Sequence, residues 1–252
     1  SPESILSLGA TAQESIAQFE AMDDDERKKI RLLRGHMGYG LHEYFAGPAT
    51  YFTILRDPVA RVISHYNFIL RTPDHYLYDR IIDGELSLYD LLQKDYALML
   101  NDAQVRLISG VWGDAPFGQV TPEMTETAKK NLTESFAVVG LMEQFDKSVQ
   151  LLKETFNWPA PVTYLRRNVS KKGMTEETLP RETVELIRQV NQQDQALYDF
   201  GRELFKEQCT RRGPGFDLRT RYFQSVNKYG QPNQRLRTFS VRVKLKELFA
   251  AR

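Results

Sequence analysis

Arginine, proline and serine side chains surround a predicted change from strand to helix. Residues 51–55 are apolar or β-branched, and the run is short enough for a buried strand. Pro58 suits the first turn of a helix, because proline lacks an N–H that would have no partner there. Arg56 then lies beside a helix N-terminus, which favours anions, and Ser64 follows within about two turns. The stretch therefore predicts a pocket for a phosphate-like group.

A histidine on a glycine-rich segment precedes this strand. His36 lies between Gly35 and Gly38, and glycines at such spacing indicate close backbone approach or positive φ angles. Imidazole suits general-base chemistry at neutral pH, for example removal of a proton from an attacking alcohol. The alternative is that His36 only hydrogen-bonds within its loop. The four histidines show no regular ligand spacing, so we expect no metal site.

Two short motifs carry a family resemblance. Residues 56–66 read Arg-Asp-Pro-Val-x-Arg-x-x-Ser-x-Tyr. This resembles the 3′-phosphate-binding motif of sulfotransferases that use 3′-phosphoadenosine 5′-phosphosulfate (PAPS), with the closer resemblance to the carbohydrate branch that includes heparan sulfate 2-O-sulfotransferase. The resemblance implies that Arg56 and Ser64 hold the 3′-phosphate. A Gly-His-x-x-Tyr segment, matched by residues 35–39, implies that His36 is the catalytic base. The alternative is an ordinary strand-helix unit whose arginine forms a surface ion pair.

A basic loop late in the chain is the second predicted cofactor contact. Residues 166–173 follow a predicted strand at 162–165, and in a parallel sheet this loop ends on the same rim as Arg56. Sulfotransferases close a basic loop over the nucleotide, and this loop is similar. Arg166, Asn168 and Lys171 are therefore candidate cofactor ligands. A solvated basic turn is the alternative.

Three polar residues are candidates for contact with the acceptor. Asn101, Gln104 and Arg106 fall at about the stage of the chain where related enzymes place acceptor-site residues. The alternative is a capped helix with solvated polar groups. The segment 110–119 contains aromatic residues and either shapes a sugar-binding wall or plugs the core.

Alternating patterns predict an α/β fold, a single domain over residues 1–252 with a parallel sheet flanked by helices. The family resemblance implies the PAPS sulfotransferase fold, which is similar to P-loop nucleotide kinases. A second buried strand is expected at 136–142. The first expected helix starts near Thr11 and ends in or after the acidic cluster 23–26. Further helices are expected at 86–100, 121–131, 143–156 and 180–208.

Charge and cysteine content limit the partners. The net charge of the 252 residues is +1, but residues 211–252 hold eleven Lys and Arg against two acids, a balance of +9. This basic C-terminal segment suits a polyanion or is simply exposed. Cys209 is the only cysteine, so an intramolecular disulfide is impossible and a reducing compartment is favoured.

The family's Pro-Lys-Thr-Gly-Thr-Thr-like loop, which holds the 5′-phosphosulfate, does not occur in the sequence. Residues 7–11 are small and polar but lack Pro-Lys, and no strand is expected before them. We expect the loop and the first strand to lie upstream of Ser1; otherwise the protein does not transfer sulfate. The sequence has no segment of 18 apolar residues. A cytoplasmic location is expected, with the Golgi lumen and a missing membrane anchor as the alternative. In a secretory lumen the sequons at Asn131 and Asn168 would matter.

The resemblance predicts a PAPS-dependent sulfotransferase that acts on a hydroxyl, in a carbohydrate by family similarity. PAPS would be the cofactor, adenosine 3′,5′-bisphosphate (PAP) the product, and no metal or nucleic acid would be needed. Two alternatives remain open. One is a phosphoryl-transfer enzyme of similar fold, and the other is a polyanion-binding protein without activity. The oligomeric state is not predicted.

Overall fold

The computed structural model describes residues 5–7, 17–34, 38–44, 47–93, 96–111, 115–158, 164 and 173–229. Its strands are β1 (Ile5–Ser7), β2 (Leu32–Arg34), β3 (Tyr51–Leu55) and β4 (Phe136–Leu141). Its α-helices are α2 (Asp24–Lys29), α3 (Pro58–Ile69), α4 (Tyr78–Ile82), α5 (Leu88–Gln93), α6 (Ala103–Ser109), α7 (Pro122–Glu134), α8 (Phe145–Thr155), α9 (Arg181–Val190), α10 (Gln192–Thr210) and α11 (Phe216–Tyr229). Short 3₁₀ helices span Leu41–Tyr44, Leu98–Leu100, Met142–Gln144 and Glu176–Thr178.

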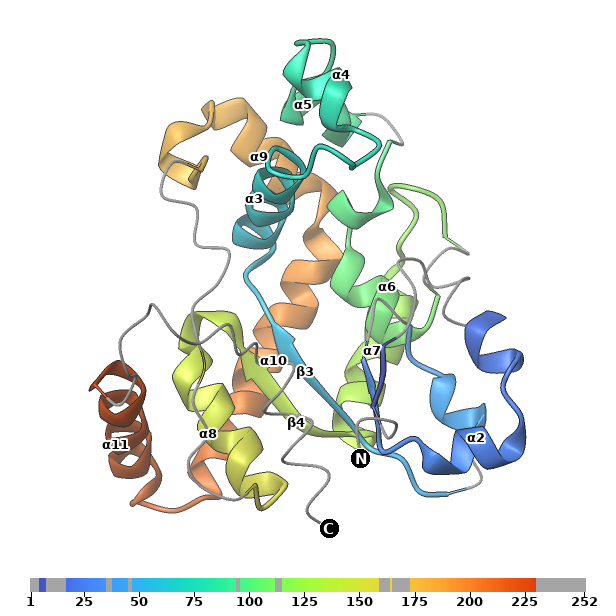
Figure 1. The fold of residues 1–252 in the computed structure, drawn as a ribbon. Coiled ribbons are helices and arrows are strands. Elements are labelled where there is room, and N and C mark those ends of the chain that lie inside the picture. Colours follow the sequence, from blue (N-terminus) through green and yellow to red (C-terminus); the bar gives the residue numbers. More distant parts are fainter. Residues whose placement is uncertain are drawn as a thin grey trace.

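The described strands form two parallel pairs. β3 pairs with β4 and ends with Leu55 opposite Leu141, so the chain leaves both strands at the same edge. β1 pairs with β2 in a separate sheet, where Ser7 lies opposite Arg34. Figure 1 shows β3 and β4 at the centre with α3 continuing from β3. The predicted α/β class with a parallel sheet is therefore confirmed, although helices predominate.

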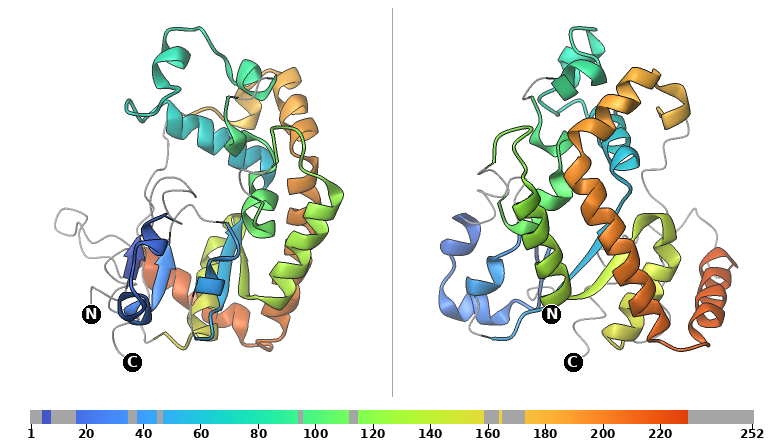
Figure 2. Two further views of the ribbon diagram at one scale, coloured as in Figure 1. Left: turned by 90° about the vertical axis from the view of Figure 1, so that its right-hand side faces the viewer. Right: turned by 180° about the vertical axis from the view of Figure 1, so that it is seen from behind.

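Helix α10 covers one face of the central strands. It packs against β4, α6 and α7, and Figure 2 shows it crossing β3 and β4 when the molecule is seen from behind. Gly201 permits this close packing, because a Cβ atom there would lie 2.3 Å from Cδ1 of Leu55. Leu55 is itself buried, and Arg56 follows it directly. The position of the strand end therefore depends on how closely α10 packs.

The buried apolar residues form two main clusters, one on each side of the strand end. The first surrounds β3, β4 and the inner faces of α6, α7, α8 and α10. The second joins α3, α4 and α5 to α9. The segment from Leu55 to Pro58 connects them, since Leu55 belongs to the first cluster and Val59 to the second. This connection holds the β3–α3 bend in place on both sides.

The local predictions hold where strong signals mark an end. β3 covers Tyr51–Leu55 and α3 begins at Pro58, as predicted. α7 also begins as predicted, with Pro122 in its first turn and the Thr121 side chain accepting from the Met124 N–H. β4 matches the predicted strand at 136–142 to within one residue.

Three predicted helices were wrong in their bounds. The acidic cluster begins a helix instead of ending one, because Asp23 and Glu26 form a capping box at the start of α2. The predicted helix 86–100 contains α5 and a separate 3₁₀ helix, Leu98–Leu100. The predicted helix 180–208 is split into α9 and α10 at Asn191, whose side chain donates to the carbonyls of Leu100 and Ile187.

The N-terminal region also departs from expectation. A strand, β1, does precede residues 8–11, although none was expected there. It is short, and residues 8–16 lie outside the described part of the chain. Of the strand predicted at 162–165 the structure describes Tyr164 alone, so that prediction remains open.

Candidate functional site

The turn between β3 and α3 has a fixed backbone. Asp57 is the N-cap of α3, and its carboxylate accepts from the Ala60 N–H at 2.9 Å. The Asp57 N–H donates to Glu143 Oε1 at 3.0 Å, and the Tyr198 hydroxyl donates to the other oxygen of Glu143 at 2.8 Å. Burial and the Glu143 contact raise the pKa of Tyr198, so its hydroxyl stays a donor. The turn is thus tied to β4 and α10 before any ligand binds.

Arg56 and Ser64 line one cavity of about 470 Å³ beside this turn. Its walls come from the end of β3, one side of α3, one side of α6 and the 3₁₀ helices Leu98–Leu100 and Met142–Gln144. The remaining lining residues are Thr53, Ile54, Leu55, Arg61, His65, Phe68, Met99, Ala103, Gln104, Leu107, Ile108 and Met142. The structure therefore brings together the two residues predicted to contact phosphate.

A second arginine, Arg61, also lines this cavity, beside a buried carboxylate. It lies 3.5 Å from the fully buried carboxylate of Asp194 and donates to the Met99 carbonyl at 2.6 Å. Burial lowers the pKa of Arg61, Asp194 opposes that shift, and the nearby charge of Arg56 adds to it. Two guanidinium groups on one cavity repel each other, and an anion between them would relieve that repulsion.

Of the three acceptor candidates only Gln104 lines the cavity. Arg106 is fully buried and donates to the backbone and side-chain oxygens of Asn101, to the Pro116 carbonyl and to the Ala115 carbonyl. Asn101, 1% exposed, also donates to the Val190 carbonyl. These contacts join α6 to the segment after it and to the end of α9. They favour the structural alternative for Asn101 and Arg106, and we do not carry those two residues into the proposed site.

The other candidates, His36, Arg166, Asn168 and Lys171, lie outside the described residues, but the chain that follows His36 is bonded to α6 and the chain that follows Lys171 is bonded to α3. Tyr39 donates its N–H to the carbonyl of Leu107, a cavity residue, at 2.7 Å. Asn67 of α3 bonds both backbone groups of Met174, at 2.8 and 2.9 Å. Tyr39 and Met174 each follow a candidate, His36 and Lys171, by three residues.

Asp194 and its neighbours were missed by the sequence interpretation, although a signal was present. Two polar residues, Asn191 and Asp194, continue the apolar spacing of Val184, Ile187 and Leu197 along α9 and α10. That spacing places them on the inward face, and both are at most 1% exposed. Polar residues in an apolar stripe are informative, because burial of a charge requires partners.

Asp102 and Asp194 cap each other's helices. The Asp194 carboxylate accepts from the N–H groups of Gln104 and Val105 at the start of α6, and Asp102 Oδ1 accepts from the Asp194 N–H at the start of α10. Burial, the largest cause, and the charge of Asp194 raise the pKa of Asp102 to about 7. One of these two carboxyl groups therefore changes its charge near neutral pH.

This pKa predicts a pH-dependent stability. At pH values between the pKa of Asp102 in the unfolded chain and about 7, the Asp102 carboxyl group is ionised in the unfolded chain and protonated in the folded chain. The free energy of unfolding therefore falls as the pH rises through that range. Asp102→Asn removes this contribution, which is at most about 4 kcal/mol, and asparagine suits the left-handed backbone there (φ 44°). Urea unfolding at pH 5 and pH 8 should show that the variant gains stability relative to wild type at the higher pH.

The comparison between the two proteins removes the contributions of groups that do not interact with Asp102, because those contributions are the same in both. Burial also raises the pKa of Asp194, which still contributes a slope in the variant, altered by the loss of the Asp102 charge. Asp102→Ala is the control, since it removes the acceptor for the Asp194 N–H and should destabilise the protein at both pH values. A constant stability difference between Asp102→Asn and wild type from pH 5 to pH 8 would refute the assignment.

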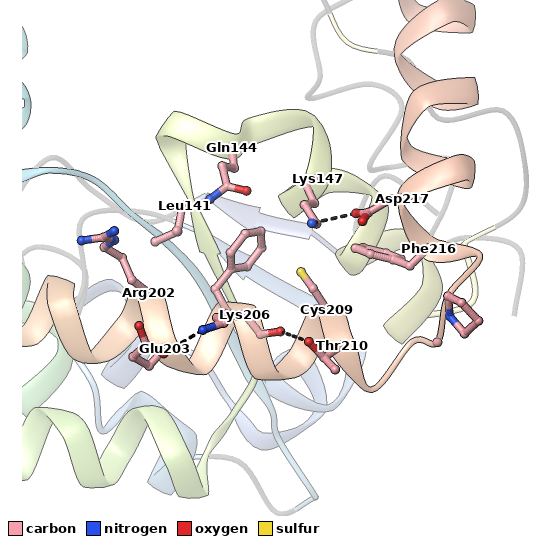
Figure 3. Close-up of a pocket in the computed structure, with 13 residues that line it drawn as sticks. Leu141, Gln144, Lys147, Arg202, Glu203, Lys206, Cys209, Thr210, Phe216 and Asp217 are labelled. Atoms are coloured by element: carbon pink, nitrogen blue, oxygen red, sulfur yellow. Dashed lines mark hydrogen bonds and ion pairs between the residues drawn. The ribbon is translucent and has the colours of Figure 1, made fainter.

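A larger cavity of about 600 Å³ lies between α8, α10 and the start of α11 (Figure 3). Each of its cations has an acidic partner: Lys147 pairs with Asp217, Lys206 with Glu203, and Arg202 with Asp199. Burial raises the pKa of the Cys209 thiol at its floor to about 11, which keeps the thiol protonated and unreactive. None of the motif residues lines this cavity, and the charges do not favour an anion.

The described residues contain no cluster of three or more histidine, cysteine or acidic side chains arranged to hold a metal ion. None of the described helices combines the length and the apolar character that crossing a membrane requires.

The amino-acid sequence of the chain is similar to those of several known proteins. No protein-family model matches the chain. Human heparan-sulfate 6-O-sulfotransferase 1 is 27% identical over 182 residues, covering 62% of this chain and 43% of the relative. Heparan-sulfate 6-O-sulfotransferase 2 is 26% identical in Gallus gallus, over 72% of this chain and 47% of the relative, and 29% identical in Danio rerio, over 71% and 43%. The chain is similar to the heparan-sulfate 6-O-sulfotransferases.

This similarity confirms the predicted resemblance to carbohydrate sulfotransferases but corrects the branch of the family that the chain resembles. The curated relatives are 6-O-sulfotransferases, whereas the motifs had indicated greater similarity to the 2-O branch. The chain spans less than half the length of the curated relatives it matches. What those relatives act on is therefore a basis for a proposal about this chain.

Proposed function

We propose that the protein is a PAPS-dependent sulfotransferase of the heparan-sulfate type, with a glycan hydroxyl as acceptor. The observation that supports it best is the shared cavity of Arg56 and Ser64 at the carboxyl end of β3, in a chain similar to 6-O-sulfotransferases. A parallel sheet binds ligands at this edge. The proposed fold is that of PAPS sulfotransferases and resembles P-loop nucleotide kinases.

In the proposed reaction, Arg56 and Ser64 hold the 3′-phosphate of PAPS. His36 accepts the proton of the acceptor hydroxyl as the hydroxyl oxygen bonds to sulfur. The bond between sulfur and the 5′-phosphate oxygen breaks, and PAP leaves with those electrons. Positioning and fixed positive charge can stabilise this in-line displacement without a metal.

The anchored chain segments support the roles of His36 and the basic loop. Tyr39, three residues after His36 in the sequence, bonds the cavity residue Leu107. Met174, three residues after Lys171, is bonded to Asn67, one turn beyond Ser64 on α3. Arg166, Asn168 and Lys171 are proposed to contact the nucleotide phosphates from this side.

Transfer of radiolabelled sulfate from PAPS to heparan sulfate and to its 6-O-desulfated form tests the proposal. We expect labelling of the desulfated glycan, unaffected by EDTA. Glycan binding with a steep salt dependence but no labelling would support the polyanion-binding alternative. Transfer of phosphate from ATP that requires Mg²⁺ would support the kinase alternative.

Exposed aromatic rings at the cavity suggest where the glycan packs. Phe68 lines the cavity with 45% of its surface exposed, and its ring contacts those of His65 and His75. Tyr76, 69% exposed, stacks on His75. An exposed aromatic patch of this kind marks a binding surface, since a ring face can pack against sugar C–H groups.

Phe68→Ala should therefore raise the KM for the glycan about 5- to 10-fold, corresponding to about 1 kcal/mol of ring contact, and leave PAP affinity unchanged. Tyr222→Ala is the matched control, because Tyr222 is 73% exposed on α11 and does not line the cavity. Weaker PAP binding in Phe68→Ala would instead place the nucleotide base on this ring.

The glycan acceptor also bears on location. We propose the Golgi lumen, the alternative raised by the sequence, in place of the cytoplasmic expectation, because a glycan acceptor favours the secretory pathway. Of the two sequons, Asn131 is half-buried and donates its side-chain N–H to the Ile108 carbonyl at 2.9 Å, which disfavours modification there.

A further inference from the structure

The Arg56 peptide lies where the strand ladder stops. The last paired residues of β3 and β4 are Leu55 and Leu141, so Arg56 needs other partners for its backbone. The Gln104 side chain supplies both of them. Its Oε1 accepts from the Arg56 N–H, and its Nε2 donates to the Arg56 carbonyl, each at 2.9 Å. One carboxamide thus takes the place of a peptide on a neighbouring strand.

Gln104 is itself held from behind. Asp194 Oδ2 accepts from the Gln104 backbone N–H at 3.2 Å and lies 3.4 Å from its Nε2. That oxygen also lies 3.5 Å from Arg61 Nε, so one buried carboxylate faces both Gln104 and a cavity arginine. Gln104 is only 8% exposed, which leaves its side chain little freedom to rotate.

The contacts of Gln104 differ from those of the buried amides near it. Asn101 and Asn191 bond to carbonyls near the end of α9 and at the end of the 3₁₀ helix Leu98–Leu100, and neither side chain hydrogen-bonds to Arg56. Gln104 alone among these three amides lines the cavity. Its two bonds fix the direction in which the Arg56 side chain leaves the backbone.

We propose that Gln104 is a positioning residue for the donor: its carboxamide fixes the Arg56 peptide so that the Arg56 guanidinium and the Ser64 hydroxyl reach the same phosphate. This inference rests on the proposed function, because the phosphate is the 3′-phosphate of PAPS. A preorganised arginine loses less conformational freedom when it binds. The role concerns binding of the 3′-phosphate specifically and does not extend to the rest of the nucleotide.

Gln104→Met tests the inference, because methionine is similar in size and lacks both polar groups. We expect the Kd for PAP, measured by calorimetry, to rise about 10-fold, as for the loss of about 1.4 kcal/mol of hydrogen bonding. The Kd for adenosine 5′-monophosphate, which lacks the 3′-phosphate, should not change. Equal losses for both nucleotides, or none for PAP, would overturn the inference.

Gln104→Glu should restore PAP binding at low pH, where the introduced carboxyl group is protonated. A protonated carboxyl group can make both bonds to Arg56, one accepted and one donated, with one donor fewer than the carboxamide, whereas the ionised group only accepts. Relative to wild type at the same pH, this variant should bind PAP well at pH 5 and progressively less well as pH rises. A ratio to wild type that does not vary with pH would contradict a role for the donated bond to the Arg56 carbonyl.

A matched control separates this role from stability. Gln150→Met changes another buried glutamine, which lies on α8 and bonds to Glu154. It should leave the preference for PAP over adenosine 5′-monophosphate intact. If wild-type protein itself shows no such preference, the proposed function fails. If wild type shows it and Gln104→Met retains all of it, only the role of Gln104 fails.

Discussion

Replacing His36 by alanine should reduce the rate constant for sulfate transfer by roughly 10²- to 10⁴-fold, the usual contribution of a general base. The acceptor hydroxyl has a pKa far above neutrality, so it attacks sulfur slowly unless its proton is removed as the bond forms. PAP affinity should not change, because the proposed base contacts the acceptor and not the 3′-phosphate. Initial rates at saturating PAPS, together with calorimetric titration of PAP, measure both quantities.

His42→Ala is the control for this prediction. His42 lies six residues further along, and its Nδ1 is 2.8 Å from the Tyr51 hydroxyl, on the strand that leads to Arg56. Its loss should affect stability more than the chemical step. Added imidazole should restore part of the activity of His36→Ala and none of any lost by His42→Ala. A His36→Ala protein with the full transfer rate would remove His36 from the mechanism.

Arg56→Ala should weaken PAP binding by roughly 10- to 150-fold, because a hydrogen bond to a charged group contributes about 1.5–3 kcal/mol. The loss should be confined to ligands that carry the 3′-phosphate. Arg61, which also lines the cavity, lies against Asp194 and cannot replace a guanidinium at the end of β3. Affinities for PAP and for adenosine 5′-monophosphate, measured in the same buffer and salt, provide the comparison.

Two further variants test whether the loss of affinity is specific to the Arg56 guanidinium. Arg56→Lys keeps the charge without the planar pair of donors, so its affinity for PAP should be intermediate. Arg181→Ala removes an arginine whose side chain is 91% exposed on α9 and should have no effect. If Arg56→Ala bound both nucleotides as wild type does, the phosphate would have to bind elsewhere.

The β3–α3 unit could be predicted because its signals are local. An apolar run and a proline in the first helical turn specify the strand end and the helix start within eight residues, and the positions of Arg56 and Ser64 follow from that geometry. The splitting of the predicted helix 180–208 was less accessible. It depends on Asn191, which contacts Leu100 across 91 positions of sequence.

The partners of Gln104, Asn101 and Arg106 could not be predicted either, because they lie far away in the sequence or depend on how the helices pack. Gln104 was selected for acceptor contact, but its observed partners are the backbone of Arg56, 48 positions away, and Asp194, 90 positions away. Asn101 and Arg106 have polar side chains that a sequence cannot distinguish from ligand-binding ones. Their buried positions became evident only from the packing of α6 between α7 and α10.

A crystal structure of the protein with adenosine 3′,5′-bisphosphate is the most direct test of the phosphate site. We expect the 3′-phosphate within hydrogen-bonding distance of both the Arg56 guanidinium and the Ser64 hydroxyl, at the carboxyl end of β3. A nucleotide bound with its 3′-phosphate away from these two side chains, for example in the cavity between α8 and α10, would contradict the proposed site and the function built on it.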